Sequence, residues 1–241
     1  MIRMSNSSKN KQLSNLIRKV RPNWPTLRNF IGKGAYGAVY GTNNGRVMKI
    51  SSGNTSNEFK SLRALQGLHF VPRVKNGNLV FFNENNGKVL KGLVKGFGEG
   101  QPSAFIMNRV GGATGMTLGK YLSKYPKANM TRLSNRLVNM VKTLGVKGYS
   151  HMNLHEENII VTADSLGRIT GMWLIDFGLA RKLAQRQVNE LSSVLLENML
   201  GRKIPAFGPE VMRRRQSIAK NLKLLPNKQN LKRLGRSRTV N

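Results

Sequence analysis

The sequence HMNLHEEN, residues 151–158, is followed eighteen residues later by the triplet Asp176-Phe177-Gly178. Short apolar runs between the two segments predict a pair of strands, Ile159–Val161 and Met172–Ile175. Apolar residues before the first segment recur at helical spacing and predict a long amphipathic helix that ends before Gly145. A helix, a polar loop, two strands and an aspartate-bearing turn form a specific order.

A glycine-rich stretch farther upstream predicts a β-hairpin. Gly32, Gly34, Gly37 and Val39 fill the pattern G-x-G-x-x-G-x-V, and a turn and a second strand, Val47–Ile50, follow. Glycines at these positions let the backbone come close to phosphate oxygens. In a dinucleotide-binding fold such a glycine turn opens a helix, so the β-favouring residues that follow here favour a hairpin instead.

Two charged residues after the hairpin are candidates for an ion pair. Lys49 lies on the second strand, twelve residues beyond Gly37, where a cation can hold phosphates. Glu58 is the only acid before residue 84, and it opens a predicted helix, Asn57–Leu68. We expect Glu58 to pair with Lys49. The alternative is a simple interaction of Glu58 with the helix dipole in the first turn.

Further strands are predicted at Leu79–Phe82, at Val89–Val94 and, as a buried strand, at Ala104–Val110. Met107 lies inside the last of these. A short helix is predicted at Leu13–Val20, within a segment rich in Ser, Asn, Lys and Arg.

Taken together, the motifs resemble those of the eukaryotic-like protein kinase superfamily over residues 30–180. The resemblance implies an α+β, two-lobed kinase-like fold, with a small β-rich N-lobe at residues 24–110 and a mostly helical, truncated C-lobe at residues 111–211. A basic N-terminal arm at residues 1–23 and a basic C-terminal tail at residues 212–241 would flank the lobes.

The same resemblance implies roles for individual residues. Lys49 and Glu58 would act on the phosphates of ATP, and Asn158 and Asp176 would bind Mg²⁺. Met107 would be the gatekeeper-like residue, and the backbone of Asn108–Val110 would contact the adenine ring. An ordinary core position explains Met107 equally well. The residues implied to contact the nucleotide are Gly32, Gly34, Gly37, Val39, Lys49, Glu58 and Met107. The residues implied to be catalytic are Lys49, Asn153 and Asp176.

The catalytic loop departs from the kinase pattern at one decisive position. His151, Leu154 and Asn158 match the template H-R-D-L-x-x-x-N, but Asn153 stands where kinases have the aspartate that accepts the hydroxyl proton. An amide can orient a hydroxyl group but cannot take up its proton. Loss of a general base commonly slows a reaction by roughly 10²–10⁴-fold. Glu156 or Glu157 is an alternative base, but their place in the loop favours a position that faces solvent.

Two other departures concern the substrate and the short segment that follows Gly178. His155 makes the loop similar to the H-G-D-L-H segment of aminoglycoside-type phosphotransferases, which act on small molecules. After Gly178 the chain leads at once into a predicted helix, Asn189–Leu200, and this resembles minimal, RIO-like kinases. Gly208-Pro209-Glu210 can alternatively be interpreted as a counterpart of the kinase A-P-E triplet.

The composition is strongly basic, with a formal net charge of +31. No acid precedes residue 58 or follows residue 210, so both ends are predicted to contact nucleic acid, another polyanion or neighbouring proteins. No apolar run is long enough to span a bilayer, and the polar start lacks the core of a secretory signal. The chain has no cysteine. We expect a protein that is not secreted and is either intracellular, in the cytoplasm or nucleus, or packaged in a virion.

Three hypotheses follow. The first is a Ser/Thr-type phosphotransferase that transfers the γ-phosphate of Mg-ATP to a protein hydroxyl. The second is an inactive pseudokinase that binds nucleic acid or neighbouring chains through its basic arms. A compact kinase-like chain rich in Asn, Lys and Gly resembles proteins of large DNA viruses, in which kinases are packaged in particles. The third hypothesis is a small-molecule phosphotransferase.

Overall fold

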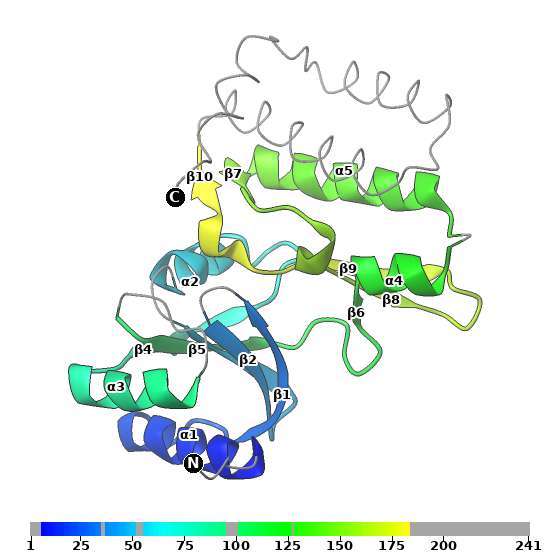
Figure 1. Cartoon of the computed structure of the whole chain (residues 1–241). Helices are drawn as coiled ribbons and strands as arrows, with labels where there is room; N and C mark the ends of the chain where they lie inside the picture. The colour runs from blue at the N-terminus through cyan, green and yellow to red at the C-terminus, as the bar shows by residue number, and fades with distance from the viewer. Residues whose placement is uncertain (1–5, 35–36, 52–54, 95–100, 127, 184–241) are drawn as a thin grey trace, which may run out of the picture. The chain divides into compact units, whose positions relative to one another are not determined.

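A computed structural model describes residues 6–34, 37–51, 55–94, 101–126 and 128–183, and the described part of the chain has an α+β fold. It divides into two compact units (Figure 1). The second unit contains residues 129–156 and 181–183, and the first contains the other described residues. Residues 157–180, which the sequence analysis assigns to the C-lobe, group with the β-rich unit.

Several predictions concern segments outside the described residues. They are the helix at Asn189–Leu200, the triplet Gly208-Pro209-Glu210 and the basic tail at residues 212–241.

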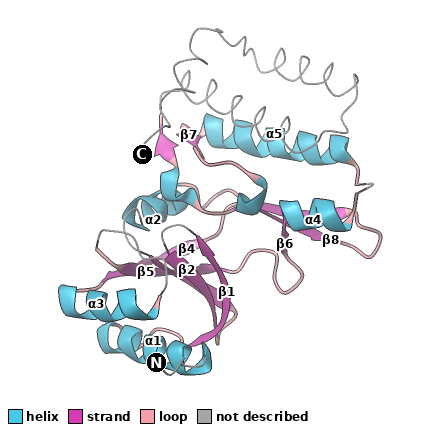
Figure 2. Ribbon diagram, viewed as in Figure 1, coloured by secondary structure: helices cyan, strands magenta, loops and turns pink. Residues whose placement is uncertain are grey.

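The first unit is built on a five-stranded antiparallel sheet with the strand order β1-β2-β3-β5-β4 (Figure 2). Its strands are β1 (Leu27–Gly34), β2 (Gly37–Thr42), β3 (Arg46–Ser51), β4 (Val74–Phe81) and β5 (Ser103–Asn108). Gly34 lies opposite Gly37, so β1 and β2 form the predicted hairpin. The predicted strands at residues 47–50 and 104–110 are confirmed as β3 and β5.

One face of this sheet holds an apolar core covered by α1 (Asn6–Val20) and α3 (Glu84–Leu93) (Figure 1). Alternation along β3 sends Met48 and Ile50 to this face, and neither is exposed at all. The fully buried residues that the two helices bring to the core are Leu13, Ile17 and Leu90.

Residues 6–20, which belong to the predicted N-terminal arm, form the helix α1 and pack on the sheet. The helix predicted at residues 13–20 begins at Asn6, and its apolar residues Leu13, Leu16 and Ile17 lie in the core. The Ser14 Oγ accepts a hydrogen bond of 3.0 Å from the backbone N–H of Leu27. The apolar spacing predicted the helix, but the basic composition did not show that its narrow apolar side would pack on the sheet.

The prediction of a strand at Val89–Val94 is wrong, because this segment belongs to α3. The helix is capped by Asn83, whose side chain accepts a hydrogen bond of 3.0 Å from the N–H of Asn86. Asn83 and the residues after it therefore start a helix instead of joining two strands. Leu90 and Leu93 then face the core at helical spacing.

The opposite face of the sheet carries α2 (Thr55–Ala64). It begins two residues before the predicted helix at residues 57–68 and ends four residues before the predicted end. Beyond α2 the chain turns, and the N–H of Leu68 donates a hydrogen bond to the carbonyl oxygen of Leu65. Phe59 packs edge-on against Phe105 of β5, with 5.9 Å between ring centroids. This contact fixes α2 against the sheet.

A smaller three-stranded sheet completes the first unit. It contains β6 (Met116–Thr117), β8 (Ile159–Ala163) and β9 (Ile169–Leu174), and α4 (Leu118–Lys124) follows β6. The strands β8 and β9 confirm the predicted antiparallel pair. The hydroxyl group of Tyr121 donates a hydrogen bond of 2.7 Å to the carbonyl oxygen of Gly167, which ties α4 to the turn between these strands.

The second unit contains α5 (Met130–Val146), which confirms the predicted long helix. Its N-terminus is capped by Asn129, whose side chain accepts a hydrogen bond from the N–H of Arg132. The short strands β7 (Tyr149–Ser150) and β10 (Arg181–Lys182) pair in the same unit. Across the described ranges of the chain, no helix has both the length and the apolarity needed to cross a membrane.

Candidate functional site

The candidate site lies on the face of the five-stranded sheet that also carries α2. Lys49 of β3 is opposite Val39 of β2 and Phe105 of β5, so all three point to this face. Met107 follows two residues after Phe105 and shares the same side of the sheet. The sheet register therefore brings together Val39, Lys49 and Met107, which the sequence analysis assigned to nucleotide binding.

Lys49 forms two short ion pairs. Its Nζ lies 2.7 Å from Glu58 Oε2 of α2 and 2.7 Å from Asp176 Oδ1. The predicted pair between Lys49 and Glu58 is thus present. The sequence analysis missed Asp176 as the second partner, because 127 residues separate it from Lys49 and no periodic pattern links them.

Burial and charge act against each other in this cluster. The side chain of Glu58 is 3% exposed, whereas that of Asp176 is 40% exposed. Burial lowers the pKa of the Lys49 ammonium, but attraction to Glu58 and Asp176 outweighs burial, and the pKa is raised. Burial raises the pKa of the Glu58 carboxyl, and this exceeds the opposing effect of Lys49. The cluster therefore holds its lysine charged at neutral pH.

Asp176 begins a tight turn that is anchored by its neighbour. Its backbone is left-handed, with φ 62° and ψ 64°, and it precedes the 3₁₀ turn η2 (Phe177–Leu179). Phe177 is completely buried, and η2 packs on α2. The buried aromatic ring fixes the turn, and the more exposed carboxylate of Asp176 is held next to Lys49.

Asn158 lies at the same end of the β8–β9 pair as Asp176. Ile159 is opposite Leu174, and the N–H of Ile175 donates a hydrogen bond of 2.9 Å to the carbonyl oxygen of Asn158. Asn158 is buried, and it closes the 3₁₀ turn η1 (Glu156–Asn158). The two residues implied to bind metal are therefore brought to one end of a single strand pair.

The glycines of the hairpin have different surroundings. A Cβ atom on Gly37 would collide with the carbonyl oxygen of Ile50 and would lie 2.6 Å from Cα of Ser51, whereas one on Gly32 would meet nothing within 4 Å. Packing against β3 alone therefore explains glycine at position 37. No packing contact explains glycine at position 32. The hairpin tip at residues 35–36 lies outside the described part of the chain.

Asn153 and His151 belong to the second unit, so their places are described within that unit. His151 and Leu154 are buried, and Asn153 is half-buried. The residue between them, Met152, has a φ of 61°. Met152 and Asp176 are the only described non-glycine residues with a positive φ, and each lies in one of the two motif segments. Such backbone conformations cost energy and are concentrated at functional sites in proteins.

The donor set of the first unit fits Mg²⁺ bound together with a polyphosphate. Within the described ranges no cluster of three or more His, Cys, Asp or Glu side chains could hold a metal by itself. Mg²⁺ usually keeps several waters and takes one or two carboxylates plus phosphate oxygens. Asp176, which is half-exposed, and Asn158 at the same end of the strand pair supply one carboxylate and one amide oxygen for such a site.

The sequence matches no protein-family model, and no curated protein is similar to it.

Proposed function

We propose that this protein is a minimal protein-kinase-like phosphotransferase, which binds Mg-ATP and transfers its γ-phosphate to a protein hydroxyl. One observation carries the proposal: Lys49 Nζ lies between Glu58 Oε2 and Asp176 Oδ1, at 2.7 Å from each. A lysine fixed by a helical glutamate beside an aspartate at a turn is the arrangement that protein kinases use to hold phosphates.

The charges of the cluster suit a nucleotide with its metal. One ammonium and two carboxylates sum to −1 when all three are ionised. Lysine has three N–H donors, so two remain within the cluster and one is left for a phosphate oxygen. A bound Mg²⁺ would supply positive charge that neutralises the phosphate oxygens during transfer. Asp176 and Asn158 would be its protein ligands.

The sheet supplies the rest of the nucleotide site. Val39 and Met107 lie on the same face as Lys49 and would contact the adenine ring. Gly32, which no packing contact explains, would let the hairpin backbone approach the phosphates. Phe105 of β5 lies opposite Lys49 on the same face and packs against Phe59 of α2.

Asn153 favours a second candidate, an inactive pseudokinase that still binds the nucleotide. The amide of Asn153 can orient a substrate hydroxyl, but it has no site that takes up the hydroxyl proton. Phosphoryl transfer depends mainly on positioning and electrostatics, so a slow reaction is compatible with this residue. The two candidates share the Lys49 cluster and differ in turnover.

The test measures phosphate transfer from labelled ATP with Mg²⁺ to one basic and one acidic protein substrate, in parallel with Mg-ATP binding by calorimetry. The variants are Asp176→Ala and Asn153→Asp, and the control is Lys88→Met, which removes a lysine from an exposed pair with Glu84. We expect binding in the wild type and the control, and transfer that Asp176→Ala abolishes. Restoring the base should raise transfer by roughly 10²-fold or more.

The outcomes separate the candidates. Binding without transfer in the wild type, with transfer gained in Asn153→Asp, identifies the pseudokinase. If the wild type does not bind Mg-ATP, or if Asp176→Ala behaves like Lys88→Met in both assays, the proposal fails.

A further inference from the structure

We propose that the α1 side of the first unit binds single-stranded nucleic acid, with one unstacked base in the pocket between α1 and the β2–β3 turn. This surface is distinct from the Lys49 cluster, because Lys49 points to the opposite face of the sheet from Met48 and Ile50. The inference does not depend on the proposed phosphotransferase function.

The first observation is the sign of the charge. From residue 6 to residue 57, every described Lys and Arg side chain other than Lys49 lies at least partly at the surface, and the sequence contains no acid before Glu58. None of these surface cations forms a salt bridge with a described acid. They are Lys9, Lys11, Arg18, Lys19, Arg21, Arg28, Lys33 and Arg46. Such a surface attracts a polyanion.

The second observation is that α1, which carries several of these cations, is packed firmly against the sheet. The apolar side of α1 is buried in the core, and the Asn10 side chain donates a hydrogen bond of 2.6 Å to the carbonyl oxygen of Arg28 on β1. On the solvent side, Lys11 and Arg18 are exposed and lie seven residues apart, so they share one helix face. This face leads along α1 toward its C-terminal end, where the pocket lies.

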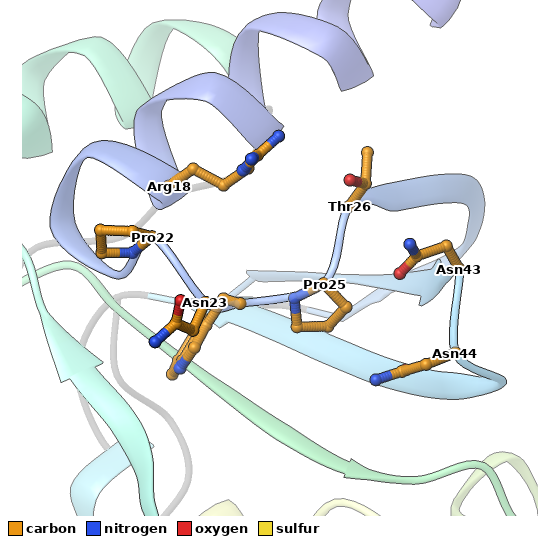
Figure 3. A pocket seen from close by; sticks show the side chains of 8 residues that line it. Arg18, Pro22, Asn23, Pro25, Thr26, Asn43 and Asn44 are labelled. Carbon is orange, nitrogen blue, oxygen red and sulfur yellow. The ribbon is translucent and has the colours of Figure 1, made fainter.

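The third observation is the pocket itself, which has a volume of about 370 Å³ (Figure 3). The wall on one side is Arg18 of α1, and the wall on the other is the β2–β3 turn with Asn43 and Asn44. The segment between α1 and β1 forms the floor and contributes Pro22, Asn23, Trp24, Pro25 and Thr26.

Hydrogen bonds hold the walls of this pocket in place. The N–H of Asn43 donates a bond of 3.0 Å to the carbonyl oxygen of Thr26, which ties the turn to the floor. The Thr42 hydroxyl lies 2.7 Å from Asn44 Oδ1 and 2.9 Å from the carbonyl oxygen of Arg46, so it holds both ends of the turn. Trp24 is half-buried and packs on the core, so its indole ring is a firm part of the lining.

These lining groups match a nucleotide better than a carboxylate-rich protein. An indole provides a stacking surface for a base, and base stacking on aromatic side chains is the common basis of single-strand recognition. Asparagine amides both donate and accept, as base edges do. Arg18 at the rim would contact a phosphate, and the cations along α1 would follow the backbone. A duplex cannot place a stacked, paired base in such a pocket.

The test uses the full chain and fluorescence anisotropy with labelled RNA and DNA oligonucleotides of about 12 nucleotides, a length within the usual site size. The variants are Arg18→Gln and Trp24→Leu. Their matched controls are Lys88→Gln, which removes the same charge from α3, and Trp173→Leu. Each measurement is repeated at several salt concentrations and with saturating Mg-ATP.

We expect Trp24→Leu to weaken single-strand binding by about 5-fold to 100-fold, the range for losing one stacked base. Arg18→Gln should weaken it several-fold and lower the salt slope by about 1. Lys88→Gln and Trp173→Leu should change binding less than 2-fold, and Mg-ATP should not compete.

Several results would overturn the proposal. Equal effects of Arg18→Gln and Lys88→Gln would show that only net charge matters. Duplex DNA bound as tightly as a single strand, with the same dependence on Trp24, would exclude an unstacked base. Displacement of the oligonucleotide by polyglutamate at equal charge concentration would identify a general site for acidic chains. Competition by Mg-ATP alone would assign the binding to the Lys49 cluster.

Discussion

The two faces of the five-stranded sheet are built from the same strands but depend on different physical effects. On the α1 and α3 side, Met48 and Ile50 join a core of buried apolar side chains. On the α2 side, Lys49 is held between two carboxylates at 2.7 Å. The apolar face stabilises the unit through buried area, which tolerates changes of shape. The charged face depends on each partner being present, so it is less tolerant of single changes.

The largest expected effect is on the charged face. Lys49→Met leaves Glu58 buried without its cation, and removing one member of a buried ion pair costs about 3–5 kcal/mol. We expect a loss of this size in the free energy of unfolding in urea, together with loss of Mg-ATP binding. Tryptophan fluorescence follows the unfolding of the first unit, because both tryptophans of the chain, Trp24 and Trp173, lie in that unit.

The control for this variant is Lys88→Met. Lys88 pairs with Glu84 at the surface, where such pairs are worth at most about 1 kcal/mol. If both variants lose the same stability, the two faces do not differ in the way described.

The second effect tests the apolar face. Leu13 is completely buried, so Leu13→Ala should cost about 2–4 kcal/mol, whereas Lys11→Ala on the exposed side of α1 should stay within about 0.5 kcal/mol. Mg-ATP affinity of the folded protein should not change in either variant. A negligible effect of Leu13→Ala would mean that the N-terminal segment is an arm after all.

The third effect separates packing from ligand contact within the hairpin. Gly37→Ala forces a Cβ into the backbone of β3 and should cost about 1–3 kcal/mol of stability. Gly32→Ala enters open space and should leave the stability within about 0.5 kcal/mol. Calorimetry should nevertheless show weaker Mg-ATP binding for Gly32→Ala. Unchanged affinity would remove the hairpin from the nucleotide site.

The smallest effect is a dependence of stability on alkaline pH. The pKa of Lys49 is raised above the ordinary 10.5, so the folded state holds this proton more tightly than the unfolded state. The resulting stability is fully present below pH 10.5 and is lost as the pH rises through the raised folded value. Urea unfolding at a series of pH values from about 9 upward measures this loss.

Glu58→Gln removes one of the two attractions that raise the Lys49 pKa, so the fall in stability above pH 10.5 should become shallower. Glu84→Gln, which removes an exposed acid on α3, should leave the fall unchanged. Equal slopes in all three proteins would show that Glu58 does not act on the Lys49 pKa.

The parts of the fold that could be predicted from sequence are those with a strong local signal. The hairpin of β1 and β2 follows from its glycines and β-favouring residues, and β8 and β9 follow from short apolar runs around a turn. The helix α5 follows from its apolar spacing. In each case the local preference and the final packing agree.

The misses have physical reasons as well. Val89 and Leu90 occur in strands as well as in helices, and an asparagine such as Asn83 is typical of turns as well as of helix caps. In α1 the apolar spacing predicted a helix, but the basic composition of the segment predicted an arm, because composition averages over the two sides of a helix. In the site, Glu58 could be predicted because it is the only acid before residue 84 in the sequence, whereas the contact of Lys49 with Asp176 depends on the tertiary packing of η2.

The left-handed backbone at Asp176 limits which residues can replace it over evolutionary time. Glycine, asparagine and aspartate adopt this conformation readily, and other residues do so at a higher cost. Only one of these three carries a negative charge. A lineage that no longer needed the carboxylate could therefore drift to asparagine or glycine without disturbing the turn. Loss of chemistry at this position would then leave no mark on the fold, and an inactive descendant would differ by a single side chain.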